Sequence, residues 1–186
     1  MLRILVVAAT VRELAPPRGW RTLLCGVGPV EAAAATAAEI VRERPSLILQ
    51  VGIAGARRAR ALRPASFVIG TESWYCDLGV SAEWAPSTIE VSPALVSAAV
   101  TALPSALLLP IGTSARVGGV AGCDVEAMEG FGVLRAAQLA GIPAIEVRAI
   151  SNDIEEADRA RWHFSEAFKA ITDATPALVA ELMQVI

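Results

Sequence analysis

The sequence predicts an α/β fold: a single domain with a mixed, mostly parallel central sheet flanked by helices. Short, continuous apolar runs recur along the chain, as is typical of strands that are covered on both faces. Between them lie longer stretches in which apolar residues follow helical spacing. This alternation indicates strands joined by helices that pack on both faces of the sheet. Because no repeat or linker interrupts the pattern, we expect one domain over residues 1–186.

The apolar runs define six expected strands. They are, in chain order, residues 3–9 (RILVVAA), 21–27 (RTLLCGV), 46–52 (SLILQVG), 66–71 (SFVIGT), 107–112 (LLLPIG) and 144–150 (AIEVRAI). In open α/β sheets, ligands bind at the carboxyl ends of the strands. The residues that follow each run are therefore the candidates for a functional site.

Four stretches are expected to be helices. They cover residues 29–44, 92–102, about 125–139 and 165 to the C-terminus. The first begins with Pro29, which suits an opening helical turn, and is rich in Ala, which packs closely on a sheet. Gly141 and Pro143 should end the third helix, and Pro176 should break the last one.

The composition excludes several classes of partner. The chain is 54% hydrophobic and 19% charged, which suits buried strands and closely packed helices. A net charge of −3, with no dense basic face, does not suit binding to nucleic acid. No apolar run reaches the about 20 residues needed to span a bilayer, so no membrane partner is expected. Thr10 and Arg12 follow the first apolar run at once, which indicates a buried strand rather than a signal peptide and hence a cytoplasmic protein.

The cysteines and the single histidine indicate neither a disulfide framework nor a zinc site. Cys25, Cys76 and Cys123 are an odd number and contain no C-x-x-C pair. We therefore expect small buried thiols and no bound metal.

Two glycine-rich segments follow expected strands. In CGVGPVEAAAA, Gly26 and Gly28 precede a helix, but Glu31 stands where the third glycine of a dinucleotide fingerprint would be. The Lys-Ser/Thr pair of a phosphate-binding P-loop is also missing, so the segment does not indicate NAD or ATP. In VGIAGA, Gly52 and Gly55 are expected to let the backbone approach a ligand closely.

Acidic and amide side chains lie at three strand-to-loop junctions. Glu13 follows the first strand, and Asn152 and Asp153 end the last strand. Glu129 lies between apolar and small residues, where the third helix should start. Each has a purely structural explanation: a solvated loop, a favourable helix-dipole contact of roughly 0.3–1 kcal/mol, or a helix cap. Together, at one edge of one sheet, they indicate a converging site.

These motifs, in this order, resemble the nucleoside phosphorylase/nucleosidase superfamily, in particular methylthioadenosine/S-adenosylhomocysteine nucleosidases and futalosine hydrolases. The resemblance rests on Glu13 after the first strand and on GVGPVEAAAA, VGIAGA, AMEGFG and VRAISND, and it runs from Met1 to about Phe168. It implies a nucleoside phosphorylase-like fold and hydrolysis of the N-glycosidic bond of a small purine nucleoside. It also implies that no cofactor is needed and that the protein is a homodimer or higher homo-oligomer.

The resemblance also assigns roles at the sugar. It implies that Glu13 holds and activates the attacking water, that Met128 packs on the ribose, and that Glu129 accepts hydrogen bonds from its 2′- and 3′-hydroxyls. The cleaved bond passes through an oxocarbenium-like sugar, which a nearby carboxylate stabilises. Burial of Glu129 would then be tolerated because the ligand satisfies its oxygens.

Other matched positions would contact the rest of the substrate. The segment Gly52, Ile53, Ala54 and Gly55 is expected to contact the ligand, although Ile53 replaces a small hydroxyl residue common in adenine-specific relatives. Residues 111–119 are expected to line the purine. Trp162 and Phe164 lie where the family closes an aromatic lid, or else they are core residues.

Asn152 departs from the aspartate that the family usually places at the purine. An amide offers one donor and one acceptor, which match a 6-oxopurine such as hypoxanthine, and Asp153 could supply an acid if its side chain turned inward. Futalosine carries hypoxanthine, and YCDLGV and EAMEGFGVLRAAQLAG resemble futalosine hydrolases, enzymes of the menaquinone pathway. The tail of futalosine carries a benzoate, for which the sequence identifies no cationic partner.

Three alternatives stay open. The first is adenine-specific methylthioadenosine/S-adenosylhomocysteine nucleosidase activity. The second is phosphorolysis, with the basic segment ARRARALR (56–63) holding the phosphate, although Glu13 would repel that anion. The third is a non-catalytic nucleoside-binding module, which intact Glu13 and Glu129 disfavour.

Overall fold

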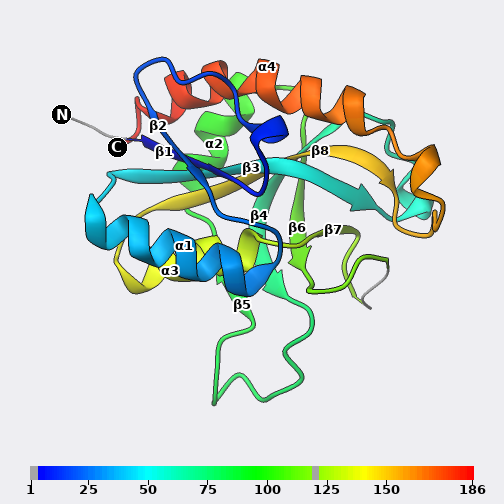
Figure 1. The fold of residues 1–186 in the computed structure, drawn as a ribbon, viewed down its shortest axis with the longest axis horizontal. Coiled ribbons are helices and arrows are strands. Elements are labelled where there is room, and N and C mark those ends of the chain that lie inside the picture. Colours follow the sequence, from blue (N-terminus) through cyan, green and yellow to red (C-terminus); the bar gives the residue numbers. More distant parts are fainter. Residues whose placement is uncertain (1–3, 119–121) are drawn as a thin grey trace.

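The computed structural model describes residues 4–118 and 122–186, in which eight strands and four α-helices form one α/β unit (Figure 1). The strands are β1 (Ile4–Ala8), β2 (Arg21–Leu24), β3 (Leu47–Ala56), β4 (Phe67–Tyr75), β5 (Thr88–Glu90), β6 (Leu107–Thr113), β7 (Val125–Ala127) and β8 (Ala144–Asp153). The helices are α1 (Pro29–Arg42), α2 (Pro93–Ala102), α3 (Gly130–Leu139) and α4 (Phe164–Leu182). All six expected strands are present, and β5 and β7 are additional.

The sheet is mixed and partly closed on itself. β2, β1, β3 and β8 run parallel. β8 also pairs with β4 in antiparallel orientation, and β4 connects through β6 and β7 back to β3. These pairs close a ring of five strands, β3, β7, β6, β4 and β8. All five strands contribute to one apolar cluster that is separate from the main core, as expected for a packed barrel interior. Its residues are Ala54, Ala56, Val68, Ile111, Val125, Ala127 and Ile150.

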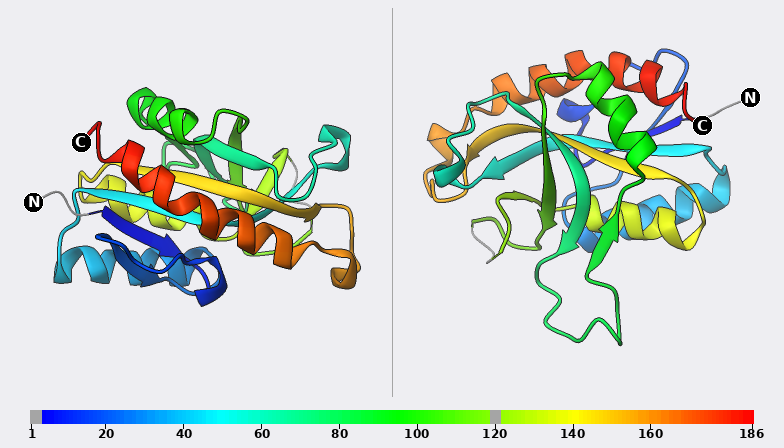
Figure 2. Two further views of the ribbon diagram at one scale, coloured as in Figure 1. Left: turned by 90° about the horizontal axis from the view of Figure 1, so that it is seen from above. Right: turned by 180° about the vertical axis from the view of Figure 1, so that it is seen from behind.

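Helices cover both faces of the sheet, as the sequence predicts. α4 and α2 lie on one face, and α1 and α3 lie side by side on the other (Figures 1 and 2). The two helices of the second pair approach closely because Gly132 has no side chain, and a Cβ at this position would overlap the carbonyl oxygen of Pro29. The strands between these layers are apolar and buried, with Leu5, Ile48 and Val147 inaccessible to solvent.

The third helix begins five residues later than expected. Residues 125–127 form β7, in which Glu126 pairs with Gly55 of β3 and with Gly112 of β6. Two neighbouring strands therefore satisfy the backbone of this segment, and this pairing outweighs its helical periodicity. The prediction of a helix from Val125 was wrong, and Glu129 is the residue immediately before the first helical turn.

The break expected at Pro176 is also absent, since α4 runs without interruption from Phe164 to Leu182. Proline removes one backbone donor, at a cost of about 3 kcal/mol in a helix interior. Ile171 on one side of the proline and Leu178 on the other are both fully buried. Their burial holds the two halves of the helix in line, so packing outweighs the local propensity.

Two strands are longer than the apolar runs that predicted them. β3 extends to Ala56 and β8 to Asp153, and the two pair in parallel over almost their whole length. VGIAGA therefore ends a strand rather than forming a loop after it, and ISND ends its strand as the sequence predicts. Their side chains therefore project from strands, which position a site more precisely than loops do.

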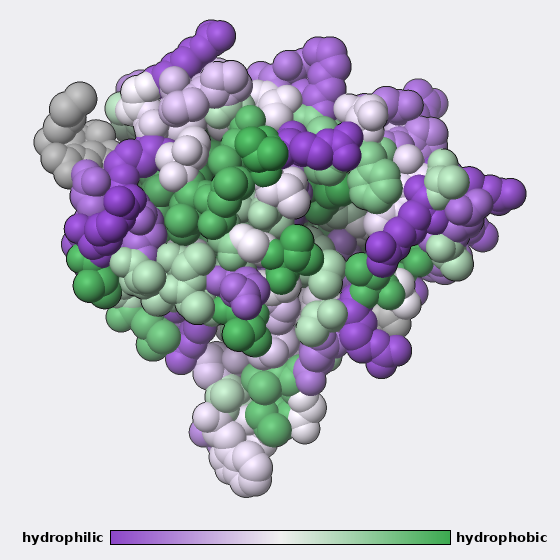
Figure 3. Space-filling model, in the orientation of Figure 1, coloured by the Kyte–Doolittle hydropathy of each residue, from purple (hydrophilic) through white to green (hydrophobic). Residues whose placement is uncertain are grey.

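The surface has an uneven distribution of apolar residues. On the face seen in Figure 1, apolar residues gather across the middle and strongly hydrophilic ones lie mostly toward the edge (Figure 3). Val11, Val27 and Val30, in the segments that follow β1 and β2, are 71%, 56% and 74% exposed. None of the helices within residues 4–118 and 122–186 combines the length and hydrophobicity needed to cross a bilayer.

Candidate active site

A cavity of about 440 Å³ opens at the carboxyl ends of β1, β3 and β8, beside the start of α3. Glu13, Met128, Glu129 and Asn152 all line it, although they are far apart in the sequence. Ile53, Ala54, Gly55 and Phe164 line it as well. The structure therefore brings together nearly all residues that the sequence singled out. Of the segment 111–119, Val117 and Gly118 line the cavity, and residue 119 lies outside the described residues.

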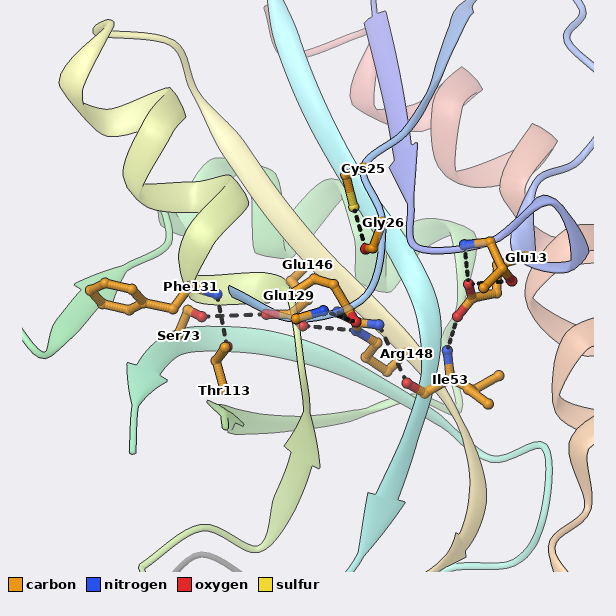
Figure 4. A network of polar contacts seen from close by, with 12 residues as sticks. Glu13, Cys25, Gly26, Ile53, Ser73, Thr113, Glu129, Phe131, Glu146 and Arg148 are labelled. Atoms are coloured by element: carbon orange, nitrogen blue, oxygen red, sulfur yellow. Dashed lines mark hydrogen bonds and ion pairs between the residues drawn. The ribbon is translucent and has the colours of Figure 1, made fainter. Parts of the chain in front are cut away.

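Glu13 is buried and held by three donors. It ends a short 3-10 helix, Val11–Glu13, and is only 4% exposed. The backbone N–H and the hydroxyl of Thr10 both donate to Oε2 at 2.8 Å, and the N–H of Ile53 donates to Oε1 at 3.2 Å (Figure 4). Burial raises the pKa of Glu13, and the charge of Glu129 adds to this, while Arg148 and Thr10 oppose it. A fixed carboxylate of raised pKa suits a general base.

Glu129 is held from two directions. Its Oε1 accepts a hydrogen bond from the N–H of Gly28 at 3.2 Å, and its Oε2 lies 3.3 Å from Nη2 of Arg148. Gly28 has φ +98°, a conformation that favours glycine, so the turn before α1 supports the carboxylate. Glu129 is 4% exposed and faces the cavity with Met128. The backbone of the glycine segment therefore binds the carboxylate of Glu129 rather than a phosphate.

Arg148 and Glu146 form a buried pair that the sequence analysis missed. They are two residues apart on β8, so they share one face of the strand. Nε of Arg148 lies 2.8 Å from Oε1 of Glu146, and its Nη1 donates to the carbonyl of Ile53 at 3.3 Å. Both residues are 1% exposed. The guanidinium therefore connects Glu129, Glu146 and the β3 backbone, as Figure 4 shows.

The charges of this cluster alter its pKa values. Burial raises the pKa of Glu146, and the adjacent Arg148 opposes the rise. Burial also disfavours the charge of Arg148, but Glu146 and Glu129 outweigh it and raise its pKa. Arg148 therefore stays protonated as the one cation among three acidic side chains. Two ionisable residues at i and i+2 in an otherwise apolar strand are the signal that would have found the pair.

Gly52 has a different role from the one expected. It does not line the cavity, whereas Ile53, Ala54 and Gly55 do. A Cβ at position 52 would overlap Nη1 of Arg148 and lie 2.8 Å from Oε1 of Glu13. The missing side chain makes room for the charged cluster rather than for a ligand.

We expect Gly52→Ala to lower kcat about 10²-fold, because it displaces Arg148 and Glu13 and small misplacements of catalytic groups have costs of this order. Steady-state kinetics with a thermal melt would measure the effect. Gly79→Ala is the matched control, since Gly79 is exposed and a Cβ there meets nothing within 4 Å. A Gly52→Ala protein with unchanged kcat would contradict this account.

Asn152 faces the cavity with its amide already oriented. The hydroxyl of Ser151 lies 2.7 Å from Oδ1 of Asn152 and 3.2 Å from the carbonyl of Ala54, and Nδ2 donates to the carbonyl of Asp153 at 2.9 Å. The carboxylate of Asp153 instead pairs with Nε of Arg58 at 3.0 Å and does not line the cavity. The structure thus brings Asn152, and not Asp153, to the site.

Aromatic rings form another wall of the cavity. Trp162, Phe164 and Phe168 line it, with ring centroids 5.3 Å apart for the first two and 6.0 Å for the last two. The indole N–H of Trp162 donates to the carbonyl of Glu156 at 2.9 Å, which leaves its ring for packing. This region is apolar, in contrast to the carboxylates by the sheet.

Two of the three thiols lie in contact, although no sequence pattern indicated it. Sγ of Cys76 and Sγ of Cys123 are 2.8 Å apart, although the residues are separated by 47 positions. Gly112 lies beside them, and a Cβ there would overlap the sulfur of Cys123. Cys25 and Cys123 are buried, as expected, and Cys76 is partly exposed.

Comparisons with known proteins found relatives by sequence and by structure. A futalosine hydrolase from Streptomyces coelicolor is 37% identical over 194 aligned positions, which cover 89% of this chain and 81% of the relative. No protein-family model matches the sequence. A methylthioadenosine/S-adenosylhomocysteine nucleosidase from Colwellia psychrerythraea, solved with adenine, superposes with a TM-score of 0.84 at 18% identity, covering 99% of this chain and 96% of its own. Futalosine hydrolase of Helicobacter pylori gives a TM-score of 0.83 at 16% identity, covering 97% and 98%. The structural likeness confirms the nucleoside phosphorylase-like fold, and the sequence identity shows that the chain belongs to the futalosine hydrolase family.

Proposed function

We propose that the protein hydrolyses the N-glycosidic bond of futalosine and releases hypoxanthine, a step of menaquinone biosynthesis. The observation that carries this is the meeting of Glu13, Glu129 and Asn152 on one cavity, in a chain 37% identical to a futalosine hydrolase. The groups match the needs of the reaction: a base for water, an acceptor for sugar hydroxyls and a donor for the departing purine.

In the proposed mechanism, the carboxylate of Glu13 takes a proton from water, and the water oxygen bonds to C1′ as the bond from C1′ to the purine breaks. The sugar gains oxocarbenium character, which the nearby carboxylates stabilise. Glu129 accepts hydrogen bonds from the 2′- and 3′-hydroxyls, and Met128 packs on the ribose. Asn152 donates a hydrogen bond to N7, the released base takes a proton from solvent, and Glu13 returns its proton to solvent. Arg148 positions Glu129 and balances its charge.

We expect Asn152→Asp to shift the base preference toward adenine nucleosides by about tenfold in kcat/KM, the equivalent of one hydrogen bond. Ser151 holds the amide oxygen and one amide N–H donates to the carbonyl of Asp153, so the second N–H is the group left for a 6-oxopurine, whereas a protonated Asp can also pass a proton to N7. The ratio of kcat/KM for inosine and adenosine measures the shift, and an unchanged ratio would contradict it. Asp153→Asn is the comparison: selective loss of activity there would assign the acid to Asp153.

One experiment separates this function from its alternatives. The protein is incubated with futalosine, inosine, methylthioadenosine and S-adenosylhomocysteine, with and without phosphate, and the free base is measured. Hypoxanthine from futalosine at a rate independent of phosphate is the expected result. Release of adenine would favour the adenine-specific activity, dependence on phosphate would favour phosphorolysis, and binding without release would favour a nucleoside-binding module.

Phosphorolysis is disfavoured by the ion pairs of three of the four arginines in the basic segment. Arg57 pairs with Glu155 at 3.6 Å, and Arg58 pairs with Asp153 at 3.0 Å. Arg60 pairs with Asp124. Their guanidinium groups are therefore already neutralised by carboxylates, and the cavity itself carries Glu13, Glu126 and Glu129, which repel phosphate.

We also propose that the protein acts in the cytoplasm as a homodimer or a higher homo-oligomer. Val11, Val27 and Val30 expose apolar side chains in segments next to the cavity, and Val27 lines it. A second copy covering them would remove this apolar area from water. Light scattering of the purified protein measures the assembly, and a monomer at micromolar concentration would contradict the proposal.

A further inference from the structure

The cavity wall has an uneven distribution of charge. Among the described residues that line it, Glu13, Glu126 and Glu129 are acidic and Arg159 alone is basic. The two acids that hold sugar and water in the proposed mechanism belong to the cluster by the sheet. Arg159 lies instead in a short 3-10 helix, Arg159–Arg161, in the turn between β8 and α4 (Figure 1). An anion is therefore repelled from one part of the cavity and attracted to another.

Arg159 stands at one end of a row of aromatic rings. Its guanidinium carbon lies 5.8 Å from the ring centre of Trp162, which is followed by Phe164 and Phe168. At the opposite end of the row, Arg12 lies 4.4 Å from the ring centre of Phe168. Arg12 does not line the cavity, whereas Arg159 does. The row thus provides an apolar aromatic surface that ends at a cation inside the cavity.

The side chain of Arg159 forms no ion pair or hydrogen bond with any residue in 4–118 or 122–186. Arg161, in the same 3-10 helix, lies 3.4 Å from Glu156 and 3.9 Å from Asp158. Arg58, across the strand end, pairs with Asp153. Against these paired neighbours, Arg159 keeps its guanidinium donors available to a ligand, and a guanidinium binds a carboxylate through two parallel hydrogen bonds.

We propose that Arg159 binds the carboxylate of the substrate's aromatic tail, and that Trp162, Phe164 and Phe168 pack against the ring that carries it. The proposal rests on the proposed function, because futalosine carries a benzoate in its tail. It gives the cavity a polarity that orients the substrate: sugar toward the carboxylates, aromatic acid toward Arg159. The row of rings matches a benzoyl group in chemistry, and a ligand with a short alkylthio tail has no group for Arg159 to bind.

The test is a cycle of two proteins and two substrates. Wild type and Arg159→Gln are assayed with futalosine and with its methyl ester, in which the carboxylate is neutral. For wild type, esterification should lower kcat/KM about tenfold. This is the lower end of the range for hydrogen bonds to charged groups, and we expect it because Arg159 is exposed to solvent. Arg159→Gln should lower kcat/KM for futalosine by the same factor and leave the ester unaffected. Arg159→Lys should recover part of the loss.

Arg161→Gln is the matched control, since Arg161 lies in the same 3-10 helix but does not line the cavity, and its kcat/KM for futalosine and for the ester should both equal those of wild type. Arg12→Gln tests the other end of the row and should leave the effect of esterification intact. The proposal would be overturned if Arg159→Gln lowered kcat/KM equally for futalosine and for the ester. It would also be overturned if Arg12→Gln, instead of Arg159→Gln, abolished the effect of esterification. Either result would leave the proposed function standing. Failure of wild type to release hypoxanthine from futalosine would overturn both.

Discussion

Glu13→Gln is expected to lower kcat for futalosine about 10²–10⁴-fold, the contribution of a positioned general base. The amide cannot accept the proton of the attacking water. Its oxygen can still take the two donors of Thr10, but its NH₂ group then faces the N–H of Ile53, so one hydrogen bond is lost. The folded state should survive this change, because the buried charge is removed along with the bond.

Initial rates of hypoxanthine release, together with calorimetric binding of futalosine, measure the two effects separately. We expect binding to weaken far less than kcat. Glu90→Gln is the control, since Glu90 is an exposed glutamate on β5. Retention of near-normal kcat by Glu13→Gln would remove Glu13 from the mechanism.

The pH profile should report the same group. A general base must be ionised, so kcat/KM should fall as the pH drops through the pKa of Glu13. Burial and the charge of Glu129 raise this pKa, and the fall should therefore begin at a higher pH than for an ordinary glutamate, whose pKa is about 4.3. The residual activity of Glu13→Gln should lack this acidic limb.

Arg148→Met is expected to destabilise the fold by about 3–5 kcal/mol, the usual effect of removing one partner of a buried ion pair. The change leaves Glu146 and Glu129 buried without their cation, and both are less than 5% exposed. Urea denaturation followed by circular dichroism gives the free energy of unfolding. Arg161→Met is the matched control: its side chain is 73% exposed, so its loss should change stability by less than about 1 kcal/mol.

A double variant distinguishes uncompensated charge from lost packing. Arg148→Met with Glu146→Gln removes both members of the closest pair, so part of the stability should return. Activity should not return with it, because Glu129 still lacks the donor that positions it. If the double variant were no more stable than Arg148→Met alone, the cost would lie in packing and the charge argument would fail.

The sequence was sufficient for most of the fold because the buried strands are continuous apolar runs. It failed where tertiary pairing decides the local structure. Residues 125–127 have helical periodicity, yet β3 and β6 capture them as a strand. Pro176 carries a strong local signal for a break, yet burial of α4 on both sides of it prevails.

The residues that line the site could be predicted from the sequence about as well as the fold. Glu13, Glu129 and Asn152 follow or end strands, where a parallel sheet places its ligands, and the cavity does contain them. The residues that hold these side chains in place could not be predicted from the sequence. The contact of Arg148 with Glu129 joins positions 19 apart through two elements, and the space that Gly52 leaves for Arg148 depends on how β3 and β8 align. No local pattern encodes such contacts.

The groups proposed to break the bond and those proposed to read the tail occupy separate parts of the chain. Glu13, Glu129 and Asn152 are anchored at the sheet, whereas Arg159, Trp162, Phe164 and Phe168 fall in one continuous stretch of ten residues, 159–168. Substitutions within residues 159–168 should therefore change the specificity for the group on the 5′ carbon without displacing Glu13, Glu129 or Asn152. A change of specificity at that end of the nucleoside should therefore leave the residues proposed for bond cleavage unchanged.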